Sequence, residues 1–435
     1  MQTIMEIDTK SLTNEKVNSM RNQNKTKNSG ATLIIFLCWL VYMVSYLGKV
    51  NYSANITHII DSYNVSKSEA GLVPTFFFFA YGIGQVVNGV LSRKYNAKWT
   101  VFTSLAISSV INLMIAVTDN FALLKWLWLI NGFVLSMLWP VLISLLAYAL
   151  PQKDLERSSI TMGTTVAIGT VMIYGLSSVY SVIDNYKLAF YTPGIIGILV
   201  SIVWLKLFKE ALYKSKKEKD EEIEIVKKEK KDITAEKEGW NKKIFIVSVC
   251  ALCFCGVGVN LIKDGLTTWV PTILKEEYSM SDSISILLTV FLPVVAVFGN
   301  LCALKVHKLI PDYITHCFIV FSLIAIIIGV IIGCLEVKWA ILMLVCLIVV
   351  NFLASSLNSL ITSIYPIFMR GKVDSGFYAG MLNGFCYLGS TISAYGLGYI
   401  AEHFGWTAVF YFLIAFCIAV AITWCGYKMY IRIVK

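Results

Sequence analysis

Long apolar runs, separated by charged or turn-forming residues, most constrain what this chain can fold into. A helix needs about 20 consecutive apolar residues to cross a bilayer. Hydrophobic residues make up 57% of the chain and charged residues 15%, whereas soluble domains have about 45–50% and about 25%. The composition therefore excludes a soluble globular protein. We predict twelve membrane-spanning helices, at approximately 31–60, 68–91, 99–118, 122–149, 158–182, 188–208, 244–274, 281–304, 313–333, 337–366, 373–401 and 405–430.

One segment differs from these runs in its charge. Residues 209–243 are rich in Lys and Glu, which predicts a solvated linker between two halves. Adding 214 to the numbers of Tyr46 and Lys49 gives Asn260 and Lys263, which indicates two parallel, similar halves. The predicted fold is all-α and integral to the membrane, with an N-terminal tail 1–30, a six-helix bundle 31–208, the linker 209–243, a second, pseudo-symmetric six-helix bundle 244–430 and a C-terminal tail 431–435.

The basic residues are distributed unequally between the two sides of this bundle. Of the 37 Lys and Arg residues, 30 fall on the side of the two termini and the linker, and five fall on the other side. By the positive-inside rule, both termini and the linker are cytoplasmic in a multi-pass protein of the plasma membrane, here expected to be a bacterial cytoplasmic membrane. The net charge of +10 then reflects orientation in the lipid bilayer, and we expect no nucleic-acid partner.

Two lysines remain, and both lie near the middle of a predicted span. Lys49 is eighteen residues into the first helix and Lys263 nineteen into the seventh. A lysine at the centre of a spanning helix costs about 2.5–3.5 kcal/mol, so something must compensate its charge. Asp264 is the only carboxylate deep within a span, but it lies about 100° around the helix from Lys263, so we expect it not to pair with that lysine.

The lysines therefore predict a binding site for an anion between the two halves. The alternative is that backbone carbonyls or buried water hold them. Polar residues on neighbouring helix faces favour a cavity, although such residues also serve as hydrogen bonds between helices. The predicted substrate-binding residues are Lys49, Lys263, Tyr42, Tyr46, Tyr81, Gln85, Asn260, Asn383 and Tyr387, and Asp264 is the candidate for proton coupling.

The sequence offers no pattern for catalysis or for metal binding. Most of the 11 cysteines lie inside apolar runs, and the four histidines are scattered along the chain. Neither set has the spacing of a metal site or of a catalytic triad. We therefore predict no enzyme activity, no cofactor and no metal.

Several motifs are similar to those of a known transporter family. Trp269-Val-Pro-Thr-Ile-Leu-Lys-Glu276 resembles W-x-P-T-Y-L-K-E, and Tyr42-x-x-x-Tyr46-x-x-Lys49 resembles Y-x-x-x-Y-x-x-R. Both motifs occur in the organophosphate:phosphate antiporters of the major facilitator superfamily, and the resemblance extends over all twelve helices. It implies a monomeric carrier that exchanges an organophosphate for inorganic phosphate by alternating access, with the substrate anion bridging Lys49 and Lys263.

The chain departs from this family at the anion-binding positions. The family has arginines where this chain has Lys49 and Lys263, a tyrosine at Asn260, and in some members a lysine at Gln85 and a histidine at Val166. An ammonium lacks the two parallel hydrogen bonds that a guanidinium gives a phosphate. A proton-coupled carboxylate or sulfonate transporter therefore stays open as an alternative, as does a transporter-like sensor of sugar phosphates.

Overall fold

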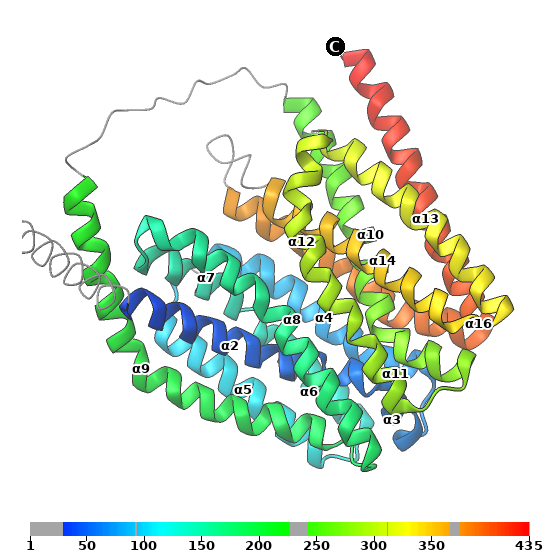
Figure 1. Ribbon diagram of the computed structural model, residues 1–435, viewed down its shortest axis with the longest axis horizontal. Helices are drawn as coiled ribbons and strands as arrows, with labels where there is room; N and C mark the ends of the chain where they lie inside the picture. Colours follow the sequence, from blue (N-terminus) through cyan, green and yellow to red (C-terminus); the bar gives the residue numbers. More distant parts are fainter. Residues whose placement is uncertain (1–28, 92–93, 227–241, 311, 366–374, 435) are drawn as a thin grey trace, which may run out of the picture.

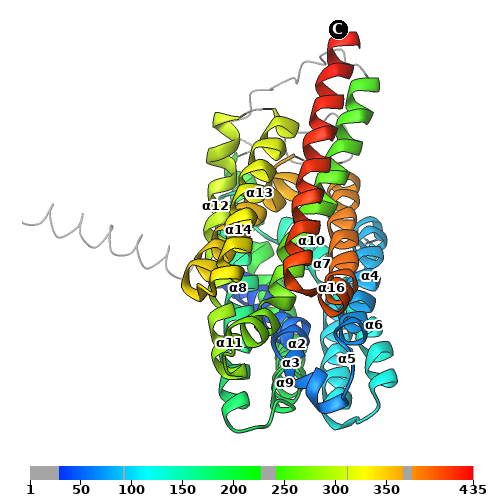
Figure 2. The ribbon, with the colours of Figure 1, turned by 90° about the vertical axis from the view of Figure 1, so that its right-hand side faces the viewer.

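The computed structural model describes residues 29–91, 94–226, 242–310, 312–365 and 375–434, and helices joined by short turns make up these ranges (Figures 1 and 2). The first half contains α2 (Ser29–Ala54), α3 (Ile56–Tyr63), α4 (Lys67–Leu91), α5 (Ala97–Val117), α6 (Phe121–Leu135), α7 (Leu138–Ala149), α8 (Gln152–Val182) and α9 (Leu188–Val226). The second half contains α10 (Lys242–Tyr278), α11 (Asp282–Thr289), α12 (Phe291–Leu309), α13 (Tyr313–Val337), α14 (Ala340–Ser359), the π-helical turn η2 (Leu360–Ile364) and α16 (Ser375–Val434).

Within the described ranges, eleven helical segments are long and apolar enough to cross a membrane. The last of them, Gly380–Arg432, is 53 residues long and contains Gly405 at φ 79°. Because this conformation interrupts a helix and is open to glycine without strain, α16 consists of two helices in succession. Each half then supplies six spans, and the prediction of an all-α membrane protein with twelve spanning helices is confirmed.

Several helix boundaries differ from the sequence prediction, among them two in the first half. The first predicted helix is divided at Asn55, whose side-chain amide donates to the Asn51 carbonyl over 2.8 Å. Helix α9 continues beyond 208, where the predicted linker begins, to Val226. Its extension packs on the first half, since Ser215 donates to the Ala149 carbonyl.

The same extension also caps the first helix. The carboxylate of Glu218 accepts hydrogen bonds from the backbone N–H groups of Gly30 and Ala31, at 2.9 and 3.1 Å. A carboxylate is favourable there, because the first N–H groups of a helix have no partner within the helix. The predicted tail at the N-terminus lies almost wholly outside the described residues, as does the second part of the predicted linker.

The two halves are joined at one end of the bundle. We call the end at which α9 stops and α10 starts the linker face, and the other end the opposite face. At the opposite face, Lys275 of α10 lies 2.7 Å from Asp61 of α3, and Lys67 of α4 lies 2.8 Å from Glu276 of α10. Lys275 also lies 3.1 Å from Asp282 of α11, so one ammonium links α10 to both α3 and α11 at this face. Figure 1 shows the end of α9 and the start of α10 far apart at the linker face.

Close backbone contact strengthens this junction between α4 and α16. A Cβ atom on Gly71 would lie 2.3 Å from the carbonyl oxygen of Ala394, and one on Gly398 would lie 2.9 Å from the carbonyl oxygen of Lys67. No side chain fits at either position unless the helices move apart. Small residues permit such an approach, and van der Waals packing then stabilises the contact in a membrane.

Replacing Lys275 with Met should open the opposite face. The change removes the ion pair to Asp61, and a partly exposed pair contributes up to about 1 kcal/mol, or roughly fivefold in the population of an open state. Spin labels at exposed Asn185 and Trp339, one in each half, should report a larger population of long distances.

Lys338→Met is the matched control for this change. Lys338 pairs with Glu277 at the same face, but both residues belong to the second half. Equal distance distributions in the two variants would show that the pair to Asp61 does not hold the halves together.

Candidate substrate-binding cavity

A cavity of about 230 Å³ lies between the two halves. Its walls come from α2, α4 and α8 of the first half and from α10, α12, α14 and α16 of the second. Among the predicted site residues, those that line the cavity are Tyr46, Lys49, Asn260, Lys263, Asp264, Asn383 and Tyr387. Tyr42, Tyr81 and Gln85 lie behind these residues and outside the cavity lining.

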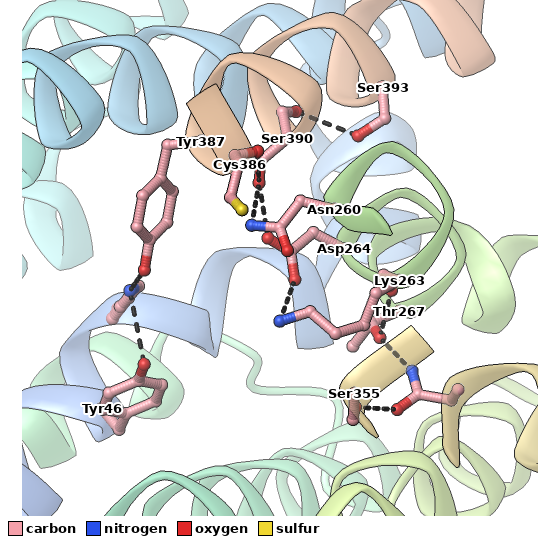
Figure 3. A network of polar contacts seen from close by, with 12 residues as sticks. Tyr46, Asn260, Lys263, Asp264, Thr267, Ser355, Cys386, Tyr387, Ser390 and Ser393 are labelled. Carbon is pink, nitrogen blue, oxygen red and sulfur yellow. Dashed lines mark hydrogen bonds and ion pairs between the residues drawn. The ribbon is translucent and has the colours of Figure 1, made fainter. Parts of the chain in front are cut away.

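Lys49 is buried among aromatic rings. Only 8% of the residue is exposed, and its ammonium donates to the hydroxyls of Tyr387 at 3.2 Å and Tyr46 at 3.5 Å. The ammonium also lies 3.9 Å from the centre of the Tyr81 ring, with the rings of Tyr46 and Tyr387 at 4.8 and 5.1 Å. Figure 3 shows the two hydroxyls directed toward one another across the space between the halves. The negative faces of these rings and the hydroxyl oxygens stabilise the cation without a carboxylate.

Tyr42 supports this arrangement from outside the cavity. Its ring meets the Tyr46 ring edge-on, with centroids 5.4 Å apart, and it packs on Trp139 at 4.7 Å. Tyr46 is thereby held in the orientation that brings its hydroxyl to Lys49. Tyr42 therefore lies one layer behind the residues that a substrate would contact.

Lys263 forms an ion pair with Asp264, which corrects the expectation from the sequence. The Lys263 ammonium lies 3.1 Å from Oδ1 of Asp264, and the two side chains are 22% and 20% exposed. Neighbouring side chains leave the helix about 100° apart, but the four-carbon stem of lysine is long enough to bring its ammonium back to an adjacent carboxylate. An angle of about 100° between adjacent side chains therefore does not prevent this ion pair.

A hydrogen-bond network fixes the carboxylate between α10 and α16, which lie side by side (Figures 2 and 3). Ser390 of α16 donates to Oδ2 of Asp264 at 2.5 Å, and the Asn260 side-chain amide donates to Ser390 at 3.2 Å. The side-chain oxygen of Asn260, Oδ1, is buried and lacks a hydrogen-bond partner among the described residues. Asp264 is thus held from both sides, by a cation and by a hydroxyl.

Gln85 and Asn383 connect the halves beside the cavity. The Asn383 amide donates to Gln85 Oε1 at 3.4 Å, and the Gln85 amide donates to the Ser136 carbonyl at 3.2 Å. Asn383 lines the cavity, whereas buried Gln85 bonds to other helices. For Gln85, the structure therefore provides a hydrogen-bonding role between helices.

Several polar residues at the cavity were not among the predicted site residues, and Ser390 and Asn300 are two of them. Ser390 binds Asp264, and Asn300 of α12 lines the cavity wall. Both are polar residues within otherwise apolar spans, which was the available signal. That signal does not separate residues facing a cavity from those facing another helix.

Comparisons with known proteins identify relatives of this chain. The family model of the Major Facilitator Superfamily matches residues 38–378. The chain is 23% identical over 421 residues to a probable hexose phosphate transport protein of Chlamydia trachomatis, covering 89% of each chain. It is also 23% identical over 407 residues to the glycerol-3-phosphate transporter of Bacillus subtilis, covering 88% of this chain and 90% of that one.

A solved structure shows the same fold. A bacterial homologue of the human lysosomal transporter Spinster, in an inward-facing and unoccupied conformation, has a TM-score of 0.72 to this chain at 12% identity. The similarity covers 93% of this chain and 98% of that one. Together with the sequence relatives, it confirms the resemblance that the motifs at residues 42–49 of α2 and 269–276 of α10 indicated.

The contact between Lys49 and the Tyr81 ring can be tested with a double-mutant cycle. Tyr81→Leu should destabilise the protein more when Lys49 is present than in a Lys49→Met background, by about 1–2 kcal/mol for a desolvated cation–π contact. The measurement is the free energy of unfolding in detergent micelles.

Tyr313→Leu provides the control, because the Tyr313 ring contacts His307 and Tyr365 in the second half. Its coupling to Lys49→Met should be within about 0.5 kcal/mol of zero, as is usual for sites without shared partners. A coupling for Tyr81 no larger than that for Tyr313 would contradict the stabilising role of the Tyr81 ring.

Proposed function

Since this chain belongs to the Major Facilitator Superfamily, we propose that it carries a small organic anion across the membrane by alternating access, with the anion bridging Lys49 and Lys263. The family and its structural neighbours are transporters and not enzymes. The substrate that we propose is an organophosphate, exchanged for inorganic phosphate. Relatives of similar length that are named as transporters of hexose phosphate and glycerol-3-phosphate support this class.

The observation that carries the proposal is the state of Lys49. It is a buried cation at the boundary between the halves, and no carboxylate within the described residues forms an ion pair with it. A substrate anion in the cavity would supply the missing charge. Because Lys49 belongs to α2 and Lys263 to α10, such an anion would attract both halves.

The contacts at the opposite face suggest how the cycle runs. Ion pairs of Lys275 and Lys67 join the halves there, so anions would enter this conformation from the linker face. We propose that the linker face is cytoplasmic, with both termini inside a bacterial cytoplasmic membrane, as the positive charge predicts. Binding would close the linker face and release the opposite one. One chain contains the whole cavity, so the proposed unit is a monomer.

The pair of Lys263 with Asp264 favours a second candidate. With lysine at both clamp positions, the site lacks the planar fork that binds a phosphate through two parallel hydrogen bonds. Asp264 is also a carboxylate within the cavity wall that could take up a proton. A carboxylate or sulfonate carried together with a proton is the alternative, and Asp264 is its coupling residue.

Counterflow in proteoliposomes tests the proposal. Vesicles loaded with phosphate should take up labelled phosphate or organophosphate, and Lys49→Ala and Lys263→Ala should each lower the rate about tenfold or more. Each removes a charge-assisted hydrogen bond of about 1.5–3 kcal/mol to the anion. Lys187→Ala is the control, because Lys187 pairs with Asp119 away from the cavity.

Three other results would change the assignment. Uptake driven equally well by a proton gradient without internal anion would replace exchange by proton coupling. Anion binding without measurable flux would indicate a sensor. Transport of a neutral sugar that survives both lysine substitutions would exclude an anion carrier.

A thermal-shift screen of phosphate esters, carboxylates and sulfonates should identify the substrate class. A ligand at 100 times its Kd stabilises the folded state by about 2.7 kcal/mol, which gives a clear rise in Tm. The rise should disappear in Lys49→Ala and persist in Lys187→Ala. A rise that is equal in both variants would place the ligand outside the cavity.

A further inference from the structure

The charge of the cavity wall is lower than the two lysines alone would give. Among the described residues that line it, the charged ones are Lys49, Lys263 and Asp264, so the formal charge of the wall is +1. A carrier with two uncompensated lysines would resist closing without substrate, because closing removes both charges from water. The cost of closing the empty cavity therefore depends on which groups of the protein offset the charge of each lysine.

Each lysine has its own compensation in the absence of an anion. Around Lys49, the hydroxyls of Tyr46 and Tyr387 and the Tyr81 ring oppose the charge. Beside Lys263, Asp264 supplies a full negative charge at 3.1 Å. In the empty cavity, neutral hydroxyls and ring faces therefore partly offset the charge of Lys49, and a full negative charge offsets that of Lys263.

The ion pair belongs entirely to the second half. Lys263 and Asp264 both lie on α10, and Ser390 of α16 holds the other carboxylate oxygen at 2.5 Å. Movement of one half against the other does not require this pair to break. Asp264 can consequently accompany Lys263 through a complete cycle.

Resting on the proposed transport function, we propose that Asp264 is a tethered counter-anion that replaces the substrate at Lys263 when the cavity is empty. The carrier can then return without substrate, so net transport accompanies exchange. An entering substrate anion displaces the carboxylate from Lys263, while Ser390 retains it by a hydrogen bond. Asp264 thus sets the ratio of net transport to exchange, and its removal leaves an exchanger that must bind an anion in order to return.

The experiment compares two fluxes from the same vesicles. Proteoliposomes loaded with radiolabelled inorganic phosphate are diluted into buffer with unlabelled phosphate, which gives exchange, or without it, which gives net efflux. Potassium and valinomycin hold the membrane potential at zero in both. In Asp264→Asn, net efflux should fall at least about tenfold relative to exchange. In Asp264→Glu, which keeps the charge, the ratio should stay within about threefold of the original.

Ser390→Ala extends the comparison, because it removes the hydrogen bond and keeps the carboxylate. Its ratio should also stay within about threefold of the original. A change in ratio is not expected from a loss of correctly folded carrier, which lowers both fluxes in proportion.

Two outcomes would overturn the proposal. One is an unchanged ratio in Asp264→Asn, including the case in which both fluxes fall together. The other is an original protein that exchanges phosphate without measurable net efflux. Absence of exchange by the original protein, with phosphate and with the anions found in the thermal-shift screen, would instead contradict the proposed function itself.

Discussion

The cost of placing a lysine ammonium within the membrane is the constraint on which the centre of this protein depends. Lys49 and Lys263 lie at similar depths in α2 and α10, where an uncompensated charge costs several kcal/mol. The surrounding side chains reduce that cost. Tyrosine rings and hydroxyls surround Lys49, and a carboxylate held by a serine faces Lys263. Both cations line the cavity between the halves.

The two halves stabilise their buried lysines by different side chains. Position 46 is a tyrosine in the first half, and its counterpart, position 260, is an asparagine in the second. The Tyr46 hydroxyl accepts a hydrogen bond from the Lys49 ammonium, whereas the Asn260 amide donates to Ser390, the residue that binds Asp264. Aromatic compensation is weaker than a full negative charge at contact distance. We therefore expect Lys49 to contribute more to the affinity for an anion than Lys263.

The contacts that join the two halves lie at the opposite face. Lys275 and Lys67 link the halves by ion pairs, and Gly71 allows α4 and α16 to touch through their backbones. Partly exposed ion pairs are individually weak, so they hold a conformation without locking it. In the proposed cycle, a substrate that draws the halves together at the cavity would have to break these ion pairs and separate the packed backbones of α4 and α16. Alternating access requires that such contacts form and break reversibly.

The sequence by itself determined the fold class, because an apolar run of about 20 residues has one stable way to cross hydrocarbon, as a helix. It also placed Lys49 and Lys263 deep within spans, since depth follows from position along a helix. It did not determine the partners of these lysines. The pairing with Asp264, the ring of Tyr81 over Lys49 and the position of Gln85 outside the cavity depend on side-chain reach and on which helices pack together. Only the tertiary structure decides these. The contacts of Tyr81 and Gln85 join segments that are distant in the sequence, and such contacts leave no periodic signal. Lys263 and Asp264 are adjacent, but the carboxylate is held by Ser390 of another helix.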